Sequence, residues 1–350
     1  MKKHQPIKLL FIATFPPPPG GQRLIFQYLF QDLSERFAAE LHLTRVDLSV
    51  KRFGRLGFFI LPFRVLKGLF LIPFHDAVTL QAPHNYIYAF GPVFYWGTRL
   101  FGKKLITRRS AGRNIELFEQ APSWLQWLLK KTVLNADLAF FETHYEVEYF
   151  ARLSRGKVRF LSNNRPMVNT QWQPLTRAIQ HFVFLGDLCQ RKGVHHLLAV
   201  FQKLGAQGKP YRLTLIGEPK IDLPPALPSN ITLLGKIPHN QVYQVLKQHD
   251  VLILPSYTEG IPGAIIEAFM MDKPVIATAI PSIREFIEPG KNGLLIEPGN
   301  ERELLQAIET IASDVERYNA MSRYIHETKE RFSTTLWTDK FVEYVKEVIQ

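Results

Sequence analysis

The sequence predicts an α/β fold of two parallel-sheet domains of the Rossmann type that face each other across a cleft. Apolar runs of strand length alternate with helical patterns along the chain, which is typical of parallel sheets covered by helices. A chain of 350 residues is also long for a single hydrophobic core. Residues 166–180 have little periodicity and two prolines, so they predict a break between the halves. We expect domains at 1–166 and 181–333, joined by a linker at 167–180.

The expected strands are short apolar runs. In the first half they are Ile7–Thr14, Leu41–Asp47, Ala77–Gln81, Lys104–Thr107, Leu138–Thr143 and Val158–Ser162. In the second half they are Phe182–Gly186, Arg212–Gly217, Ile231–Leu234, Val251–Pro255, Pro274–Thr278 and Gly293–Ile296. Segments with an apolar helical face lie between them and predict helices. Examples are Leu24–Phe37, Val194–Leu204, Gln241–His249 and Ala264–Met271.

The net charge of +12 is concentrated in the first half of the chain. Residues 1–170 hold 24 lysines and arginines against 11 acids, whereas residues 171–350 hold 19 against 20. This asymmetry indicates an acidic partner for the first half: nucleic acid, anionic lipid or a phosphorylated substrate. The single cysteine, Cys189, excludes an internal disulfide and suits a reducing cytoplasm. The uncharged run 77–98 contains two prolines and several polar residues, which predict a strand, a turn and a helix rather than a membrane span.

One segment departs from this alternation. Residues 51–74 (KRFGRLGFFILPFRVLKGLFLIPF) contain five basic residues, six phenylalanines and no acid. Cations beside Phe and Leu favour a helix lying in a bilayer interface, with the cations toward anionic headgroups. The alternative is a helix packed on the sheet with its basic edge in water. The cations expected at the membrane are Arg52, Arg55, Arg64 and Lys67.

Several motifs are missing from the sequence. It has no G-x-x-x-x-G-K-[ST] phosphate loop, no G-x-G-x-x-G after a strand and no D-x-D. Its histidines form no group with cysteine or carboxylates, so we expect neither a dedicated metal site nor a bound cofactor. The chemistry must therefore come from glycine turns, helix N-termini, cations and carboxylates.

These parts occur where strands lead into helices, the edge at which open α/β sheets bind ligands. Gly20 and Gly21 follow the first strand. Gly186 ends another strand, and Arg191 and Lys192 lead into the next helix. A third such junction is the turn 260–263. Together they could hold a diphosphate, with Lys192 as its counter-ion.

Two carboxylates lie eight positions apart in SYTEGIPGAIIEAF, at Glu259 and Glu267. Glu259 on the turn can accept hydrogen bonds from sugar hydroxyls. Glu267 lies about two helical turns deeper, at ~1.5 Å rise per residue, and can hold a vicinal diol such as a ribose. The alternative is that Glu259 caps the helix beginning near Pro262 and that Glu267 is solvated. The apolar residues around Glu267 argue against it.

With these motifs in order, the sequence resembles the retaining GT-B glycosyltransferases of family 4, the group 1 type. The similar segments are GDLCQRKGVHHLL, GKIPHNQVYQVLKQHDVLILPS, PSYTEGIPGAIIEAF, KPVIATAIPSIREFI, NGLLIEPGN and FSTTLWTDKFVEYVKEVI. The resemblance is strong from about Phe182 to the end and looser before it. It implies a metal-independent enzyme that moves a sugar from a nucleotide-diphosphate sugar to a glycan or lipid-linked acceptor. It also implies a closing helix, 334–350, that crosses back to the first domain.

The resemblance also implies roles for single residues. Lys192 and Glu259 would be catalytic, the lysine at the diphosphate and the carboxylate at the donor sugar, and Glu267 would hold the ribose. Other residues implied at the donor are Gly20, Gly21, Gly186, Arg191, Gly260, Ile261, Pro262 and Gly263, with Lys236 and Ile237 at the base.

Two positions depart from the family pattern. Asp187 stands where an arginine often clamps phosphate, so either Asp187 points away or Arg191 takes over that role. Arg109 stands where the family often has a histidine near the donor sugar. Arg108, Arg109 and Arg113 are candidates for an acidic acceptor or the donor phosphate, or else form a solvated basic rim.

Two other functions remain open at this point: a GT-B sugar-nucleotide epimerase, and a non-enzymatic basic module that binds nucleic acid. No RNA-binding motif or helix-turn-helix supports the second. We expect a peripheral enzyme on the cytoplasmic face of a membrane that builds a bacterial surface polysaccharide or lipopolysaccharide. Its expected partners are a nucleotide sugar, a glycan or lipid-linked acceptor and an anionic membrane, without nucleic acid. The donor sugar and its nucleotide, UDP or GDP, stay open.

Overall fold

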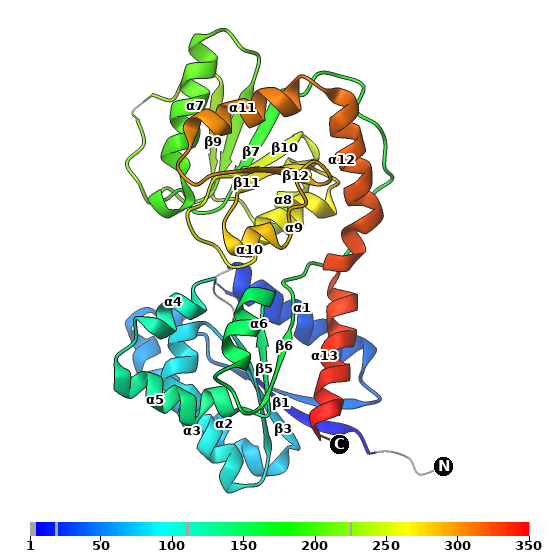
Figure 1. The fold of residues 1–350 in the computed structure, drawn as a ribbon. Coiled ribbons are helices and arrows are strands. Elements are labelled where there is room, and N and C mark those ends of the chain that lie inside the picture. The colour runs from blue at the N-terminus through cyan, green and yellow to red at the C-terminus, as the bar shows by residue number, and fades with distance from the viewer. Residues whose placement is uncertain (1–4, 18–19, 110–111, 225, 350) are drawn as a thin grey trace. The chain divides into compact units, whose positions relative to one another are not determined.

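The computed structural model describes residues 5–17, 20–109, 112–224 and 226–349, apart from the side chains of 51, 52, 55 and 58. The chain divides into two compact units. Unit 1 comprises Met1–Pro166 with Ser333–Gln350, and unit 2 comprises Met167–Phe332. Each unit contains one parallel six-stranded sheet with helices packed on it (Figure 1).

Unit 1 is built on the strand order β2-β1-β3-β4-β5-β6. The strands are β1 (Ile7–Ala13), β2 (Leu41–Asp47), β3 (Ala77–Ala82), β4 (Lys104–Arg109), β5 (Leu138–Phe141) and β6 (Lys157–Phe160). The helices are α1 (Gly21–Arg36), α2 (Gly57–Leu71), α3 (His84–Leu100), α4 (Asn114–Glu119), α5 (Ser123–Lys131), α6 (His144–Ala151) and α13 (Thr334–Ile349). Short 3₁₀ helices are η1 (Lys51–Leu56), η2 (Ile72–Phe74) and η3 (Val133–Asn135).

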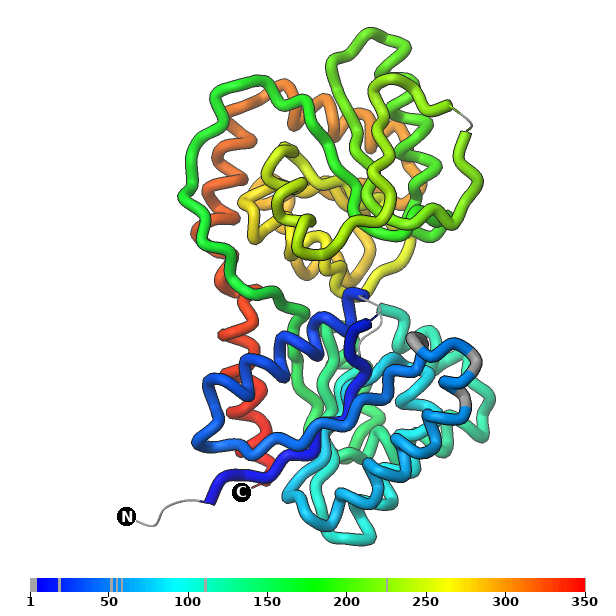
Figure 2. The backbone as a smooth tube through the Cα atoms, turned by 180° about the vertical axis from the view of Figure 1, so that it is seen from behind, coloured from blue at the N-terminus to red at the C-terminus, as the bar shows by residue number. Residues whose placement is uncertain are grey.

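The sheet of unit 1 is covered on both sides. Helices α1 and α13 pack on one side, where Phe26 and Phe341 join the core, and Figure 2 shows the blue α1 beside the red α13. Helices α2, α3 and α5 pack on the other side, where Val65, Phe94 and Leu129 join a second core. Strands covered on both sides are apolar throughout, which is why the central strands could be found as continuous hydrophobic runs.

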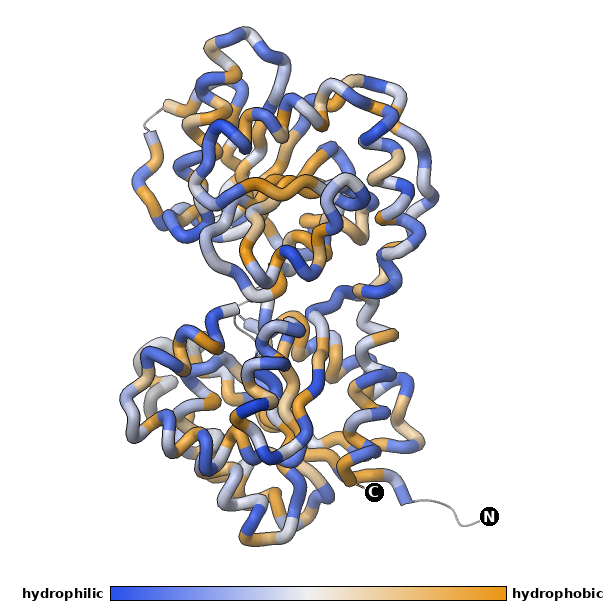
Figure 3. Tube along the Cα trace, in the orientation of Figure 1, coloured by the Kyte–Doolittle hydropathy of each residue, from blue (hydrophilic) through white to orange (hydrophobic). Residues whose placement is uncertain are grey.

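Unit 2 has the strand order β12-β11-β10-β7-β8-β9. The strands are β7 (His181–Leu185), β8 (Arg212–Ile216), β9 (Ile231–Gly235), β10 (Val251–Leu254), β11 (Val275–Thr278) and β12 (Gly293–Ile296). The helices are α7 (Val194–Ala206), α8 (His239–Lys247), α9 (Gly263–Met270), α10 (Pro281–Arg284), α11 (Glu301–Ala312) and α12 (Val315–Thr328). Two 3₁₀ helices are η4 (Gln190–Lys192) and η5 (Lys329–Phe332). Figure 3 shows hydrophobic residues concentrated along the strands inside each unit.

All twelve predicted strands are confirmed among the described residues, with ends within two residues of those expected. Helix α1 begins at Gly21, three residues before the predicted start, because its first turn is polar and carries no apolar periodicity. The uncharged run 77–98 forms β3 and most of α3, as expected. In the part of the chain that the structure describes, no helix has both the length and the apolar character needed to cross a bilayer.

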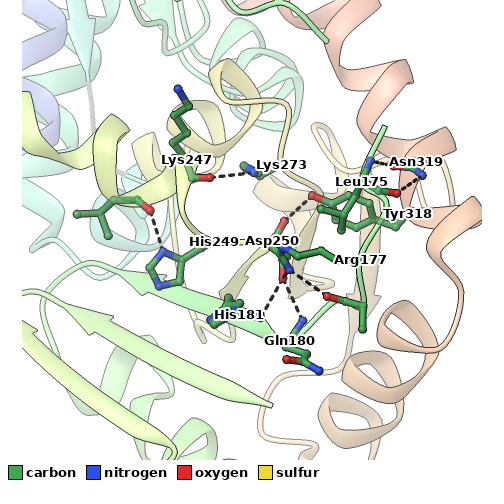
Figure 4. A network of polar contacts seen from close by, with 12 residues as sticks. Leu175, Arg177, Gln180, His181, Lys247, His249, Asp250, Lys273, Tyr318 and Asn319 are labelled. Carbon is green, nitrogen blue, oxygen red and sulfur yellow. Dashed lines mark hydrogen bonds and ion pairs between the residues drawn. The ribbon is translucent and has the colours of Figure 1, made fainter. Parts of the chain in front are cut away.

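Residues 167–180 have no regular secondary structure and pack on unit 2 (Figure 4). The Leu175 amide donates to Asn319 Oδ1 at 2.7 Å, and Arg177 forms two hydrogen bonds with Asp250, at 2.6 and 3.0 Å. The amides of Gln180 and His181 donate to the same carboxylate at 3.0 Å. Burial acts to raise the pKa of Asp250, but these donors outweigh it and hold the pKa below its ordinary value. The buried Asp250 thus ties the start of unit 2 to β10.

Candidate functional site

Three strands of unit 2 end in glycines at the carboxyl edge of the sheet. Gly186, Gly217 and Gly235 follow or close β7, β8 and β9, with φ values of 150°, 149° and 67°. The Gly186 amide donates to the Ile216 carbonyl and the Gly217 amide to the Gly235 carbonyl, each at 2.9 Å. A Cβ on Gly217 would lie 1.8 Å from the Gly186 carbonyl oxygen, so only glycine fits there. The edge is therefore bare backbone, which a ligand can approach closely.

Lys192 lies at this edge because the residue after it must be a glycine. It ends η4, and the next residue, Gly193, has φ 68° and lies against Pro255, directly after β10. A Cβ on Gly193 would lie 2.1 Å from the Pro255 carbonyl oxygen. A Cβ on Gly186 would lie 3.8 Å from Lys192 Nζ, which places the ammonium beside the bare edge.

Lys192 Nζ donates to Glu259 Oε1, and both side chains are largely buried, at 13% and 8% exposure. The same oxygen accepts from Ser256 Oγ at 2.7 Å, and Ser282 Oγ donates to the Glu259 carbonyl at 2.9 Å. Glu259 therefore has a fixed position with a cation against it. It does not cap α9, because the residue before that helix is Pro262 and no side chain caps it.

Arg191 adds a second cation next to Glu259. Its guanidinium lies 4.0 Å from Glu259 Oε2 and donates to the Thr258 carbonyl at 2.7 Å. The Tyr257 amide in turn donates to the Arg191 carbonyl at 2.9 Å. The segment after β10 and the segment after β7 thus hold each other through backbone and side-chain contacts.

Helix α9 follows directly and carries Glu267. This side chain is buried with apolar neighbours in sequence, so the alternative that Glu267 is solvated is wrong. Gly260 and Gly263 are half-buried, and Ile261 and Pro262 are buried. The N-terminus of an eight-residue helix, with its unsatisfied amides and positive dipole, therefore lies four residues after Glu259.

The remaining donor candidates fall in two places. Lys236 is exposed and Ile237 half-buried in the connection from β9 to α8, next to the bond between Gly217 and Gly235. Gly20 and Gly21 belong to unit 1, where both are exposed at the start of α1. Apart from their chain neighbours and the backbone of α1, no described atom lies within 4 Å of a Cβ built on either. Unit 2 alone thus gathers Gly186, Arg191, Lys192, Glu259 and the turn 260–263.

Asp187, the first departure from the family pattern, forms an ion pair with Lys220. Both side chains are half exposed, and the hydrogen bond from Lys220 to Asp187 raises the pKa of the lysine. The negative charge of Asp187 is therefore paired with the positive charge of Lys220.

Residues that sequence reasoning missed complete the site. Ser256 and Ser282 orient Glu259, as described above, and Gly217 allows β7 and β8 to approach at the edge. Tyr257 shares a hydrogen bond of 2.7 Å with His196 Nε2, and His196 Nδ1 lies 2.7 Å from Glu301. The serine three positions before Glu259 and the glycine ending LTLIG are signals that could have found two of these residues.

The paired arginines of unit 1 are buried at the end of β4. Arg108 donates to the Ser162 carbonyl at 3.1 Å and lies 3.9 Å from Glu142. The Arg109 guanidinium lies over the rings of Phe141 and Phe150, 5.3 and 5.1 Å from their centroids. Burial lowers the pKa of each arginine to about 10. The interpretation of these two as a solvated rim is wrong.

Arg113 differs from the other two arginines. It is half-exposed and forms an ion pair with Glu116 one turn on, and that hydrogen bond raises its pKa.

Glu146, on α6, accepts from Asn114 Nδ2 at 2.8 Å. Burial, with the charge of Glu142, raises the pKa of Glu146 to about 8. A second polar cluster therefore lies at the carboxyl edge of the unit 1 sheet.

The four cations expected at a membrane are not equivalent. The side chains of Arg52 and Arg55 lie outside the described residues. Lys67 is exposed on α2. Arg64 instead turns inward and donates to the carbonyls of Asp47 and Ser49 at 2.7 and 2.6 Å. Its expected place at the headgroups is therefore corrected: Arg64 holds the chain after β2.

Among the residues that the structure describes, no three or more His, Cys, Asp or Glu side chains form a group that could hold a metal ion. The cations around Glu259 are those of Lys192 and Arg191.

Comparison with known proteins shows what unit 2 is similar to. Residues 179–314 match the family model of the glycosyl transferases group 1. The chain is 32% identical over 165 residues to the putative colanic acid biosynthesis glycosyltransferase WcaL of Salmonella typhimurium. That match covers 43% of this chain and 38% of the relative, so the chain spans well under half the length of this curated relative.

Solved structures extend the comparison to both units. The structure of Anabaena HepE in complex with UDP matches with a TM-score of 0.72 at 17% identity, covering 97% of this chain and all of that one. Sucrose-phosphate synthase from Thermosynechococcus elongatus matches with a TM-score of 0.76 at 17% identity, covering 98% and 99%. At such identities the likeness shows the fold alone. The chain has the GT-B fold, and its residues 179–314 match the model of the glycosyl transferases group 1.

Proposed function

We propose that this protein is a retaining glycosyltransferase of family 4 that uses a nucleotide-diphosphate sugar and needs no metal ion. Its acceptor is a glycan or lipid-linked molecule in bacterial surface polysaccharide or lipopolysaccharide synthesis. The observation that carries the proposal is the buried pair of Lys192 and Glu259 beside the bare glycine edge of unit 2. The matches to a group 1 glycosyltransferase model and to a colanic acid glycosyltransferase support it.

The pair supplies the two charges that the reaction needs. A diphosphate placed over Gly186 meets the Lys192 ammonium, while the amides at the start of α9 face negative charge. When the sugar–phosphate bond breaks, negative charge grows on the departing diphosphate, and these fixed donors stabilise it. Arg191 adds a second positive charge close by.

The carboxylates act on the sugars of the donor. With the diphosphate as the new partner of Lys192, Glu259 is free to accept from hydroxyls of the transferred sugar, and Ser256 keeps it in place. Glu267, buried on α9, holds the ribose diol by charge-assisted hydrogen bonds. In a retaining reaction the acceptor then attacks the face from which the nucleotide leaves.

The acceptor side belongs to unit 1 in this proposal. Unit 1 holds 26 lysines and arginines against 14 acids, a net charge of +12, whereas unit 2 holds 17 of each. An anionic or lipid-linked acceptor at a membrane suits such a charge. We place the enzyme peripherally on the cytoplasmic face of that membrane, where nucleotide sugars are made.

Calorimetric titration with UDP and GDP tests the donor site. Lys192→Ala removes the phosphate counter-ion. Glu267→Gln replaces one of the two acceptor oxygens with an amide donor and removes the charge at similar volume, and a hydrogen bond to a charged group is worth about 1.5–3 kcal/mol. We expect each variant to weaken nucleotide binding at least tenfold, or about 1.4 kcal/mol. Lys209→Ala, at an exposed ion pair with Glu309, is the matched control and should bind normally. Wild-type affinity in both site variants would overturn the assignment.

A further inference from the structure

Helix α2 carries an exposed apolar stripe that the core of unit 1 does not use. Its members recur every three or four residues, as one face of a helix requires, and are between 60% and 73% exposed. They run from η1 through α2 to η2: Leu56, Phe59, Phe63, Leu66, Phe70 and Phe74. The opposite side of α2 faces the sheet through Val65.

The two neighbouring helices carry stripes of the same kind. On α3 and just after it, Val93, Trp96, Leu100 and Phe101 are between 40% and 78% exposed. On α5, Trp124 and Trp127 are 66% and 61% exposed. These two stripes lie outside the basic segment 51–74 that the sequence singled out.

The three stripes share one surface. Helix α3 contacts both α2 and α5, and all three helices pack on the same side of the unit 1 sheet. The approach of α2 to α3 depends on glycine: a Cβ on Gly68 of α2 would lie 3.0 Å from Phe94 Cε1, and a Cβ on Gly97 of α3 would lie 3.2 Å from Leu69 Cδ2. Since the inner side of each helix is buried on the sheet, the exposed stripes all point away from it. We call this surface the aromatic face.

The aromatic face is unusual for this molecule. Single exposed apolar residues are common on soluble surfaces, but contiguous patches mark interaction sites. Among the described residues, unit 1 exposes thirteen large hydrophobic side chains, twelve of them on this face, and unit 2 exposes four. The need to bury a hydrophobic core is common to both units, so it does not explain why unit 1 exposes more large hydrophobic side chains.

The charges beside the aromatic face select its partner. Helices α2, α3 and α5 contain no aspartate or glutamate. Lys67, Lys130 and Lys131 are exposed on two of them. Tryptophan, phenylalanine and leucine next to lysine, without acids, suit the interface of an anionic bilayer, where rings enter the acyl boundary and ammonium groups meet phosphates.

We propose that the aromatic face docks unit 1 on an anionic bilayer, with α2, α3 and α5 lying in the interface plane and their stripes inserted about 5–10 Å. The sequence suggested one segment, whereas the structure assigns a surface of three helices with Trp124 and Trp127 as anchors. The inference rests on the peripheral location proposed above but on no step of sugar transfer. Vesicle binding and nucleotide binding are separate measurements, so the two proposals fail separately.

The test is co-sedimentation of the purified protein with phosphatidylcholine vesicles, with and without about one third phosphatidylglycerol. Phe63→Gln/Phe70→Gln removes part of the α2 stripe, and Trp124→Gln/Trp127→Gln removes the α5 anchors. Leu233→Gln/Leu234→Gln, at exposed positions of β9 in unit 2, is the matched control. We expect each aromatic variant to partition to anionic vesicles at least tenfold more weakly than the wild type. The control should partition as the wild type does. Unchanged thermal unfolding and nucleotide affinity would show that the folds are intact.

Tryptophan fluorescence supplies an independent readout. Brominated acyl chains should quench the emission of the wild type, and Trp124→Gln/Trp127→Gln should remove most of that quenching. If the wild type stays in the supernatant with anionic vesicles at low salt, membrane docking is overturned. Self-association that Phe63→Gln/Phe70→Gln abolishes, without vesicle binding, would assign the face to a second copy. If only the α2 variant loses binding, the three-helix surface is wrong.

Discussion

The two helical layers on the sheet of unit 1 are alike inside and different outside. Phe341 of α13 and Phe94 of α3 are both fully buried, each in the core on its own side. Outside, Arg36 of α1 pairs with Asp339 of α13, and Lys346 of α13 pairs with Glu40 in the connection from α1 to β2. The layer of α2, α3 and α5 presents the aromatic face. Core packing sets only the inner side of a layer, so the outer side reports what the surface meets.

The largest effect should separate the inner side of a layer from its outer side. Phe341→Ala and Phe94→Ala each remove a ring from a dense core, and we expect a loss of about 3–5 kcal/mol in unfolding free energy. Phe341 packs on Phe140 with centroids 5.5 Å apart. Phe63→Ala, on the aromatic face, should change the free energy by no more than about 0.5 kcal/mol. Urea denaturation measures all three.

A large loss for Phe63→Ala would break the comparison, because it would make the aromatic face part of the core. Equal losses for Phe341→Ala and Phe94→Ala would sharpen it, because the two layers would then differ only outside.

The fold could be predicted from the sequence because buried parallel strands are continuous apolar runs. The direction in which a side chain points could not be predicted in the same way. Arg108 and Arg109 look like an exposed basic pair, yet β4 carries both into the interior. Arg64 looks like a headgroup ligand, yet it bonds carbonyls after β2. The Trp124 and Trp127 anchors were missed because an amphipathic pattern does not say which side of a helix faces the sheet.

The candidate site shows the same limit. Lys192 and Glu259 could be identified from a resemblance and from their place beside glycine turns, but their pairing required three-dimensional contacts. Ser256 and Ser282 lie 26 residues apart, and both reach Glu259 because β10 and β11 are neighbours in the sheet. Spacing along the sequence predicts which residues share one turn. Contacts between residues on different strands can be predicted only when the strand order of the sheet is known.

A smaller effect should appear with pH in the layer that carries the aromatic face, where α6 places Phe150 in the core and Glu146 beside it. Between pH 4.5 and about 8 the folded carboxyl of Glu146 keeps a proton that the unfolded chain has released. The folded state then binds more protons, so its stability falls as pH rises through this window. Glu146→Gln should flatten this slope and raise stability at pH 8 by up to about 4 kcal/mol, since one unit of pKa shift corresponds to about 1.4 kcal/mol.

Urea denaturation of Glu146→Gln and of the wild type at pH 5.5 and 8 measures this difference. A slope that Glu146→Gln leaves unchanged would contradict a raised pKa at Glu146. Glu116→Gln, at an exposed ion pair on α4, is the control, because its pKa is lowered by the hydrogen bond from Arg113. That variant should not flatten the slope above pH 5.5.

The smallest effect is expected at the outer side of α1 and α13. Asp339 is about half exposed and pairs with Arg36, which also bonds Asp32 at 2.9 Å and the Thr335 carbonyl at 3.2 Å. Arg36 therefore keeps partners in Asp339→Asn, and exposed pairs contribute only about 0.2–1 kcal/mol. We expect Asp339→Asn to lose unfolding free energy near the lower end of this range. The loss should disappear in 1 M salt, where charges are screened beyond about 3 Å. The loss in Phe341→Ala should persist at both ionic strengths. A loss above about 2 kcal/mol for Asp339→Asn would mean that this ion pair, and not the core beneath it, joins α13 to α1.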